Sequence, residues 1–93
     1  MKQQLYPTQY DEKTVMLFEH WVGQELVTAD VDVFFSNDNA LDVSYEIISP
    51  AISNANLEET ALLTIEQFYT IIGEDGLRKL LTKVEQTACE AAQ

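Results

Sequence analysis

Hydrophobic and polar residues alternate most regularly in the middle of the chain. Every second residue is apolar between positions 27 and 35, and the same rule holds between positions 41 and 47. A period of two is typical of strands with one buried face. The intervening residues 36–40 are mostly turn formers. The pattern therefore predicts a β-hairpin, whose second strand ends at Ser49 and Pro50 because proline cannot donate a hydrogen bond to a neighbouring strand.

The segment 8–22 follows a longer period. Thr8 and Asp11 have the spacing of a helix-capping box, and Gly23 suits a helix end. The apolar residues between Tyr10 and Val22, except Met16, fall within one broad arc of a helix. A strand from Lys13 to Val22 is the alternative, favoured by β-branched and aromatic residues. We prefer the helix, because a strand with this sequence would be apolar on both faces.

The C-terminal half predicts two more helices. Asn56 and Glu59 mark the start of the first, whose apolar positions recur at helical spacing as far as Ile72. Gly73 ends it, and a second amphipathic segment follows, with Glu74 and Asp75 in its first turn. So short a break between two helices is typical of an αα-hairpin.

These elements predict an α+β fold in the order α-β-β-α-α. The β-hairpin, alone or extended to a three-stranded antiparallel sheet by the N-terminal segment or a second subunit, would be packed against about three helices, because a two-stranded sheet is marginal alone. The 93 residues suffice for one hydrophobic core. We therefore expect residues 1–93 to form a single acidic domain.

Charge narrows the choice of partners. The chain has sixteen acidic and five basic residues, which give a formal net charge of -11. No Lys or Arg occurs between Lys13 and Arg78. Such a chain is unsuited to direct binding of nucleic acid or an anionic membrane, so charged partners should be basic. Cys89 is the single cysteine, and no apolar run approaches the length of a membrane span. We expect a soluble cytoplasmic protein, located in the host cytoplasm if a phage encodes it.

Acidic residues gather on one face of the predicted hairpin. Alternation fixes the register to within two residues. If Phe35 is opposite Leu41, then Asp32 lies across from Ser44 and Asp30 across from Glu46. Four carboxylates would then share the exposed face, with a fifth at the loop tip: Asp30, Asp32, Asp42 and Glu46, and Asp38. Opposed carboxylates cost stability, so the cluster is either simply solvated or kept for a partner.

Two interpretations of this acidic face stay open. Evenly spaced carboxylates on a rigid frame can imitate a phosphate backbone, and such a mimic would occupy the basic groove of a nucleic-acid-binding protein. The other interpretation is an ordinary solvated surface. Phe34 and Ile48 are predicted on the same face, where they either anchor the partner or are buried beneath the first helix or a dimer mate.

The sequence gives little support for metal binding, catalysis or phosphate binding. Asp30, Asp32 and Glu46 could offer oxygen ligands to Mg²⁺ or Ca²⁺, but their spacing matches no EF-hand loop and leaves the carboxylates splayed. His20, which the helical interpretation exposes to water, and Cys89 lie in no nucleophile motif. The glycines are too scattered for a phosphate-binding loop. We predict no catalytic residue, metal or cofactor.

The function predicted from the sequence is therefore non-enzymatic. The chain is expected to be an acidic inhibitor that binds a basic protein surface, in the style of phage anti-defence proteins such as anti-CRISPR proteins and other DNA mimics. Its partner-binding residues would be Asp30, Asp32, Phe34, Asp38, Asp42 and Glu46. The alternative is a structural or assembly subunit, in which apolar helix stripes and a free strand edge form a homodimer or larger homo-oligomer.

Overall fold

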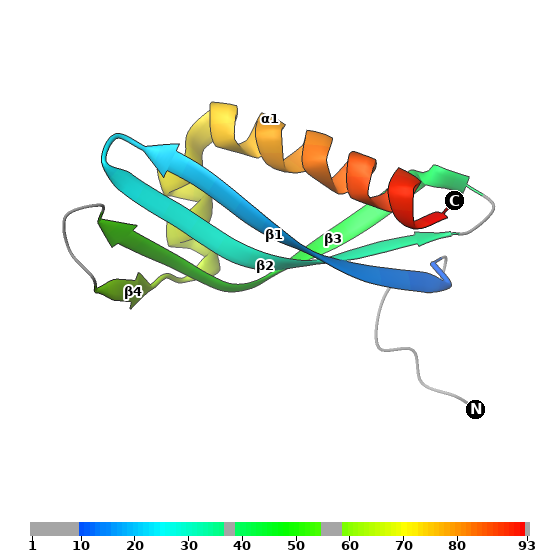
Figure 1. Cartoon of the computed structure of the whole chain (residues 1–93), viewed down its shortest axis with the longest axis horizontal. Helices are drawn as coiled ribbons and strands as arrows, with labels where there is room; N and C mark the ends of the chain where they lie inside the picture. Colours follow the sequence, from blue (N-terminus) through cyan, green and yellow to red (C-terminus); the bar gives the residue numbers. More distant parts are fainter. Residues whose placement is uncertain (1–9, 37–38, 55–58, 93) are drawn as a thin grey trace.

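A four-stranded antiparallel sheet followed by one helix makes up the fold (Figure 1). The structure, a computed structural model, describes residues 10–36, 39–54 and 59–92. The strands follow chain order across the sheet. They are β1 (Glu12–Val22), β2 (Glu25–Ser36), β3 (Asn39–Asn54) and the short β4 (Thr60–Leu62), and the helix is α1 (Ile65–Ala92).

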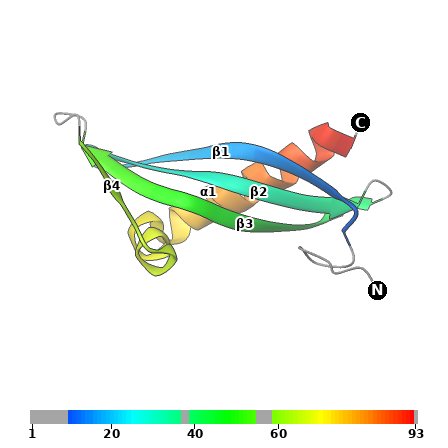
Figure 2. The ribbon, with the colours of Figure 1, turned by 90° about the horizontal axis from the view of Figure 1, so that it is seen from below.

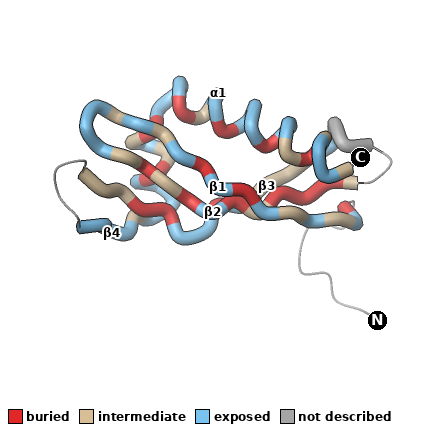
Figure 3. The backbone as a smooth tube through the Cα atoms, viewed as in Figure 1, coloured by how far each residue is buried: buried red, intermediate tan, exposed pale blue. Residues whose placement is uncertain are grey.

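The molecule has two layers, because α1 covers one face of the sheet and leaves the other face open. Figure 2 looks onto the sheet from the side opposite α1. Buried positions follow the centre of the strands and the side of α1 turned toward them (Figure 3). The core between the layers is apolar and consists of these buried side chains: Met16, Phe18, Val27, Ala29, Val31, Val33, Phe35, Ile47, Phe68, Ile72, Leu80, Val84 and Ala88.

The segment predicted as the first helix is instead the edge strand β1, so that prediction was wrong. Gly23 and Gln24 join β1 to β2 in a two-residue turn closed by the pair Val22 and Glu25. Gly23 has a φ of 64°, and such a positive φ at the first of two turn residues is typical of a type II′ hairpin turn. The glycine that suited a helix end therefore makes a hairpin turn.

The two alternating runs pair as antiparallel strands, but their register differs by two residues from the predicted one. Phe35 lies opposite Val43 rather than Leu41. The register changes again between Phe35 and Ser36, because Ser36 lies opposite Asn39. A second irregularity lies at Ser49, whose φ is 50°, and it allows β3 to continue past Pro50 to Asn54. Proline is tolerated at such a bulge, so Pro50 does not end the strand.

The C-terminal half contains one helix with a kink, where an αα-hairpin was predicted. Residues 60–62, expected within a helix, form β4 against the end of β3. α1 begins after Thr64, whose Oγ1 accepts the Gln67 N–H at 3.0 Å while Gln67 Oε1 accepts the Thr64 N–H at 2.9 Å. This reciprocal capping box sets the start of the helix. At Gly73 the backbone leaves helical geometry (φ 65°, ψ -166°) and α1 continues beyond the kink.

The predicted fold, with a hairpin against three helices in the order α-β-β-α-α, is thus replaced by the order β-β-β-β-α. The physical reason lies in β1, whose two apolar faces fit a sheet edge as well as they fit a helix. The predicted break at Gly73 is present as a kink and does not reverse the chain direction. Within the described residues, α1 is the sole helix, and it is too polar to pass through a bilayer.

Candidate protein-interaction face

The surface of the sheet turned away from α1 is called the open face. Alternation along each strand determines which residues contribute to it. In β1 the even-numbered Met16 and Phe18 enter the core, so the odd-numbered side chains point to the open face. Pairing then assigns the facing residues of β2 and β3. The open face includes Lys13, Val15, Leu17, Glu19 and Trp21 of β1, Leu26, Thr28, Asp30, Asp32 and Phe34 of β2, and Ser44, Glu46 and Ile48 of β3. Asp42 of β3 joins them by alternation, because the neighbouring Val43 packs against the core.

The sheet brings four of the predicted acidic residues onto this face. We call Asp30, Asp32, Asp42 and Glu46 the acidic patch. Because the register differs by two residues, Asp32 lies directly across from Glu46, and Asp30 lies across from Ile48. Directly opposed side chains in antiparallel strands have Cβ atoms about 5 Å apart, a distance at which like charges repel. Asp38, the fifth predicted carboxylate, lies outside the described residues.

The carboxylates of the acidic patch differ in their surroundings. Lys13 Nζ lies 3.6 Å from Asp32 Oδ2, and Tyr10 donates a hydrogen bond of 3.0 Å to Asp42 Oδ1. The carboxylates of Asp30 and Glu46 form neither an ion pair nor a side-chain hydrogen bond within the described part of the chain. The described residues therefore neutralise the patch only in part.

Phe34 shares the open face but is buried, with 6% of its surface exposed, as is Tyr10. Both rings lie outside the core cluster beneath α1. Phe34 therefore offers a partner little contact surface. Ile48, across from Asp30, is 36% exposed and is available for contact.

A row of exposed apolar side chains runs along β1 beside the acidic patch. Val15, Leu17 and Trp21 are 60%, 51% and 56% exposed, and we call them the apolar row. The sequence did not predict these residues as part of a site, although it carried the signal. A strand from Lys13 to Val22 is apolar on both faces, and only one of them can be covered by a single helix.

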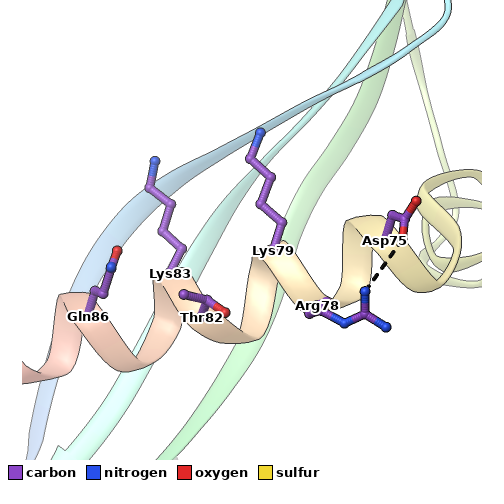
Figure 4. Close-up of a pocket in the computed structure, with 6 residues that line it drawn as sticks. All are labelled: Asp75, Arg78, Lys79, Thr82, Lys83 and Gln86. Atoms are coloured by element: carbon purple, nitrogen blue, oxygen red, sulfur yellow. Dashed lines mark ion pairs between the residues drawn. The ribbon is translucent and has the colours of Figure 1, made fainter.

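The basic residues of the described chain, apart from Lys13, lie on α1 and so in the other layer. Arg78, Lys79 and Lys83 line a shallow depression on the helix with Asp75, Thr82 and Gln86 (Figure 4). Arg78 pairs with Asp75 at 3.6 Å. Lys79 extends toward β1, and its Nζ lies 6.0 Å from the centroid of the Phe18 ring. The three helix cations therefore lie in the other layer from the acidic patch, and they form no ion pair with it.

The remaining candidate groups show no assembled chemistry. His20 was predicted to face water, but it stacks on Phe18 at 6.1 Å between ring centroids and is half-buried on the side of α1. Cys89 is half-buried near the end of α1. Burial, followed by a hydrogen bond from Tyr69 to Tyr45, raises the pKa of Tyr69. Among the described residues, no group of three or more histidine, cysteine or acidic side chains could hold a metal ion.

Comparisons with protein-family models, with curated proteins and with solved structures found no match to this chain.

Proposed function

We propose that this chain is a non-enzymatic acidic binding protein that inhibits a nucleic-acid-binding protein by occupying its basic groove. The observation that carries the proposal is the position of the acidic patch on one rigid sheet face, away from the helix cations. Asp30 and Glu46 have no cation of the described chain within ion-pair distance. A partner that supplies those cations would relieve the repulsion that the fold tolerates in the isolated protein.

The spacing of the patch supports charge mimicry. Alternate residues of a strand are separated by about 7 Å, and opposed residues of neighbouring strands by about 5 Å. Asp30 and Asp32 thus make a short row along β2, and Glu46 stands beside Asp32 on β3. Hydrogen bonding within the sheet holds these positions, so a partner need not order a flexible chain in order to bind. Such preorganisation favours affinity.

The apolar row explains why a protein surface is a better partner than a simple polycation. Trp21 is the largest exposed aromatic side chain of the open face, and exposed tryptophan is enriched among the residues that dominate binding energy. The acidic patch would direct the encounter, while Val15, Leu17 and Trp21 would pack against an apolar surface beside the groove.

The test begins with capture of partners on the immobilised chain at about 50 mM and about 200 mM salt. Each captured protein is then purified, and its affinity is measured by fluorescence anisotropy with duplex DNA as a competitor. We expect a partner that DNA displaces and that binds at least tenfold more weakly at the higher salt. The triple variant Asp30→Asn, Asp32→Asn, Glu46→Gln should lose at least a further tenfold.

A matched control carries the same change of charge on α1: Glu74→Gln, Glu85→Gln and Glu90→Gln, all at exposed positions. If both triple variants weaken binding equally, net charge rather than the acidic patch is responsible. If DNA displaces none of the captured partners, occupation of a nucleic-acid groove is contradicted.

A further inference from the structure

β1 is the edge strand of the sheet, and its outer side pairs with no other described strand. It is eleven residues long and contains no proline. Long edge strands with apolar side chains invite pairing with another chain, and proteins usually blunt them with charges, bulges or short length. Apolar residues occupy the middle of β1 on both faces. Val15 and Leu17 point to the open face, and Met16 and Phe18 point to the core. Nothing blunts the centre of this edge.

The outward backbone groups of β1 are suitably placed for a further strand. In a two-residue hairpin the pair that closes the turn, here Val22 and Glu25, exchanges hydrogen bonds, and hydrogen-bonded pairs alternate along the ladder. Even-numbered residues of β1 thus bond to β2. The odd-numbered residues, from Lys13 to Trp21, therefore direct their N–H and C=O groups to the outer edge.

We propose that two copies of this chain form a symmetric dimer by antiparallel pairing of β1 with β1, with Met16 of one copy opposite Met16 of the other. The occupant of the edge is a second copy because the sequence of β1 is complementary to itself in this register. Lys13 lies opposite Glu19 of the second copy, and the two-fold symmetry repeats the pair. Val15 lies opposite Leu17, also twice.

The face beneath α1 is complementary in the same register. Glu12 of one copy lies opposite His20 of the other. Within each copy, His20 stacks on Phe18, and Lys79 lies over the Phe18 ring. Shifting the register by two residues in either direction destroys these pairs. One shift puts Lys13 opposite Trp21 and Val15 opposite Glu19. The other puts Lys13 opposite Leu17 and Glu12 opposite Phe18.

The net charge of -11 does not prevent this association. Neighbouring strands lie about 4.8 Å apart, so the β2 strands of the two copies would be separated by three spacings, about 14 Å. The Debye length at physiological salt is about 8 Å. The acidic patches on β2 and β3 are therefore screened from each other, while Lys13 and Glu19 are in direct contact. The dimer places both open faces on the same side of one continuous sheet.

The first test is the molar mass of the full chain in solution, measured by light scattering from about 1 to 200 μM at about 150 mM salt. We expect a concentration-dependent rise toward twice the 10.5 kDa mass of one chain. A chain that remains monomeric over the whole range overturns the proposal. This measurement needs no other partner, so its outcome is independent of the proposed function.

The second test identifies the register by reversal of charge. Lys13→Glu and Glu19→Lys should each raise the dimer dissociation constant at least tenfold, because each places like charges in contact twice. An equimolar mixture of the two variants should recover dimer of wild-type affinity, since each residue then faces an opposite charge. A mixture that associates no better than either variant alone contradicts this register.

Controls separate pairing from folding and net charge. Circular dichroism of each variant checks that the sheet is intact, which matters because Lys13 also pairs with Asp32 within one chain. Glu74→Lys and Arg78→Glu repeat the same charge reversals on exposed positions of α1. These variants should dimerise as the wild type does. An equal loss in these controls would show that total charge, and not contact along β1, governs association.

Discussion

On the face of the sheet that α1 covers, Phe18, Val31 and Val33 are completely buried, whereas on the open face Leu17 and Trp21 keep half or more of their surface exposed. Both groups are apolar, and Leu17 and Phe18 are neighbours in the same strand. Residue type therefore does not decide which apolar side chains of this sheet are buried. For these side chains, coverage by α1 decides it, and the exposed apolar side chains of β1 mark where contacts with other molecules are available.

The largest difference between the two faces should appear when adjacent residues of β1 are truncated. Phe18→Ala should lower the free energy of unfolding by about 3–5 kcal/mol, because it removes a buried ring that packs against Phe68. Leu17→Ala should cost less than about 1 kcal/mol, since no core contact is lost. Urea denaturation of both variants measures the difference. Equal losses would mean that the open face is as tightly packed as the core.

A smaller effect is expected at the polar margin of the covered face. Tyr69→Phe removes the hydrogen bond of 3.1 Å to Tyr45 and should cost about 0.5–1.5 kcal/mol at neutral pH. Burial raises the pKa of Tyr69 above its ordinary value of 10.0, with the hydrogen bond as the second cause. The unfolded chain therefore loses its proton first, and the stability that Tyr69 contributes falls as the pH rises above about 10.

The measurement for Tyr69 is the free energy of unfolding at a series of pH values from about 8 to 11, compared between wild type and Tyr69→Phe. The wild type should lose stability more steeply above pH 10 than the variant. Parallel curves would show that the phenol of Tyr69 has no special role in alkaline unfolding.

The smallest effect should be a gain of stability on the open face. Glu46→Gln removes a carboxylate directly across from Asp32 and should raise the free energy of unfolding by about 0.2–1 kcal/mol. Thermal unfolding at low salt measures this gain. Glu85→Gln, at an exposed position of α1, makes the same change of charge elsewhere and should stabilise less. If the two variants are equally stabilised, the repulsion is distributed over the whole molecule.

The alternation of apolar and polar residues predicted part of the fold. The runs 27–35 and 41–47 predicted two paired strands with Asp30, Asp32, Asp42 and Glu46 on one face, and the structure places these four residues there. Here the two faces differ in polarity, so the period of two is unambiguous. Their register was not predictable, because a shift of two residues keeps every side chain on the same face and leaves the alternation unchanged.

β1 and the start of α1 were missed for different reasons. In β1 both faces carry apolar residues, so the period that distinguishes strand from helix is weak, and tertiary pairing with β2 decides the structure. The start of α1 left a clear signal in Thr64 and Gln67, which have capping-box spacing. The helix start was predicted at Asn56 and Glu59, which have the same spacing, and the signal at Thr64 and Gln67 was overlooked.

The backbone angles at the Gly73 kink restrict which amino acid can occupy this position. Its φ of 65° and ψ of -166° fall in a region that is essentially restricted to glycine, yet a Cβ atom added there would meet nothing within 4 Å. Space does not exclude a side chain at this point. Chirality does, because the mirror image of these angles is ordinary extended backbone for an L-residue. A D-alanine would therefore adopt the backbone angles of position 73 without strain, whereas any L-residue would be strained there.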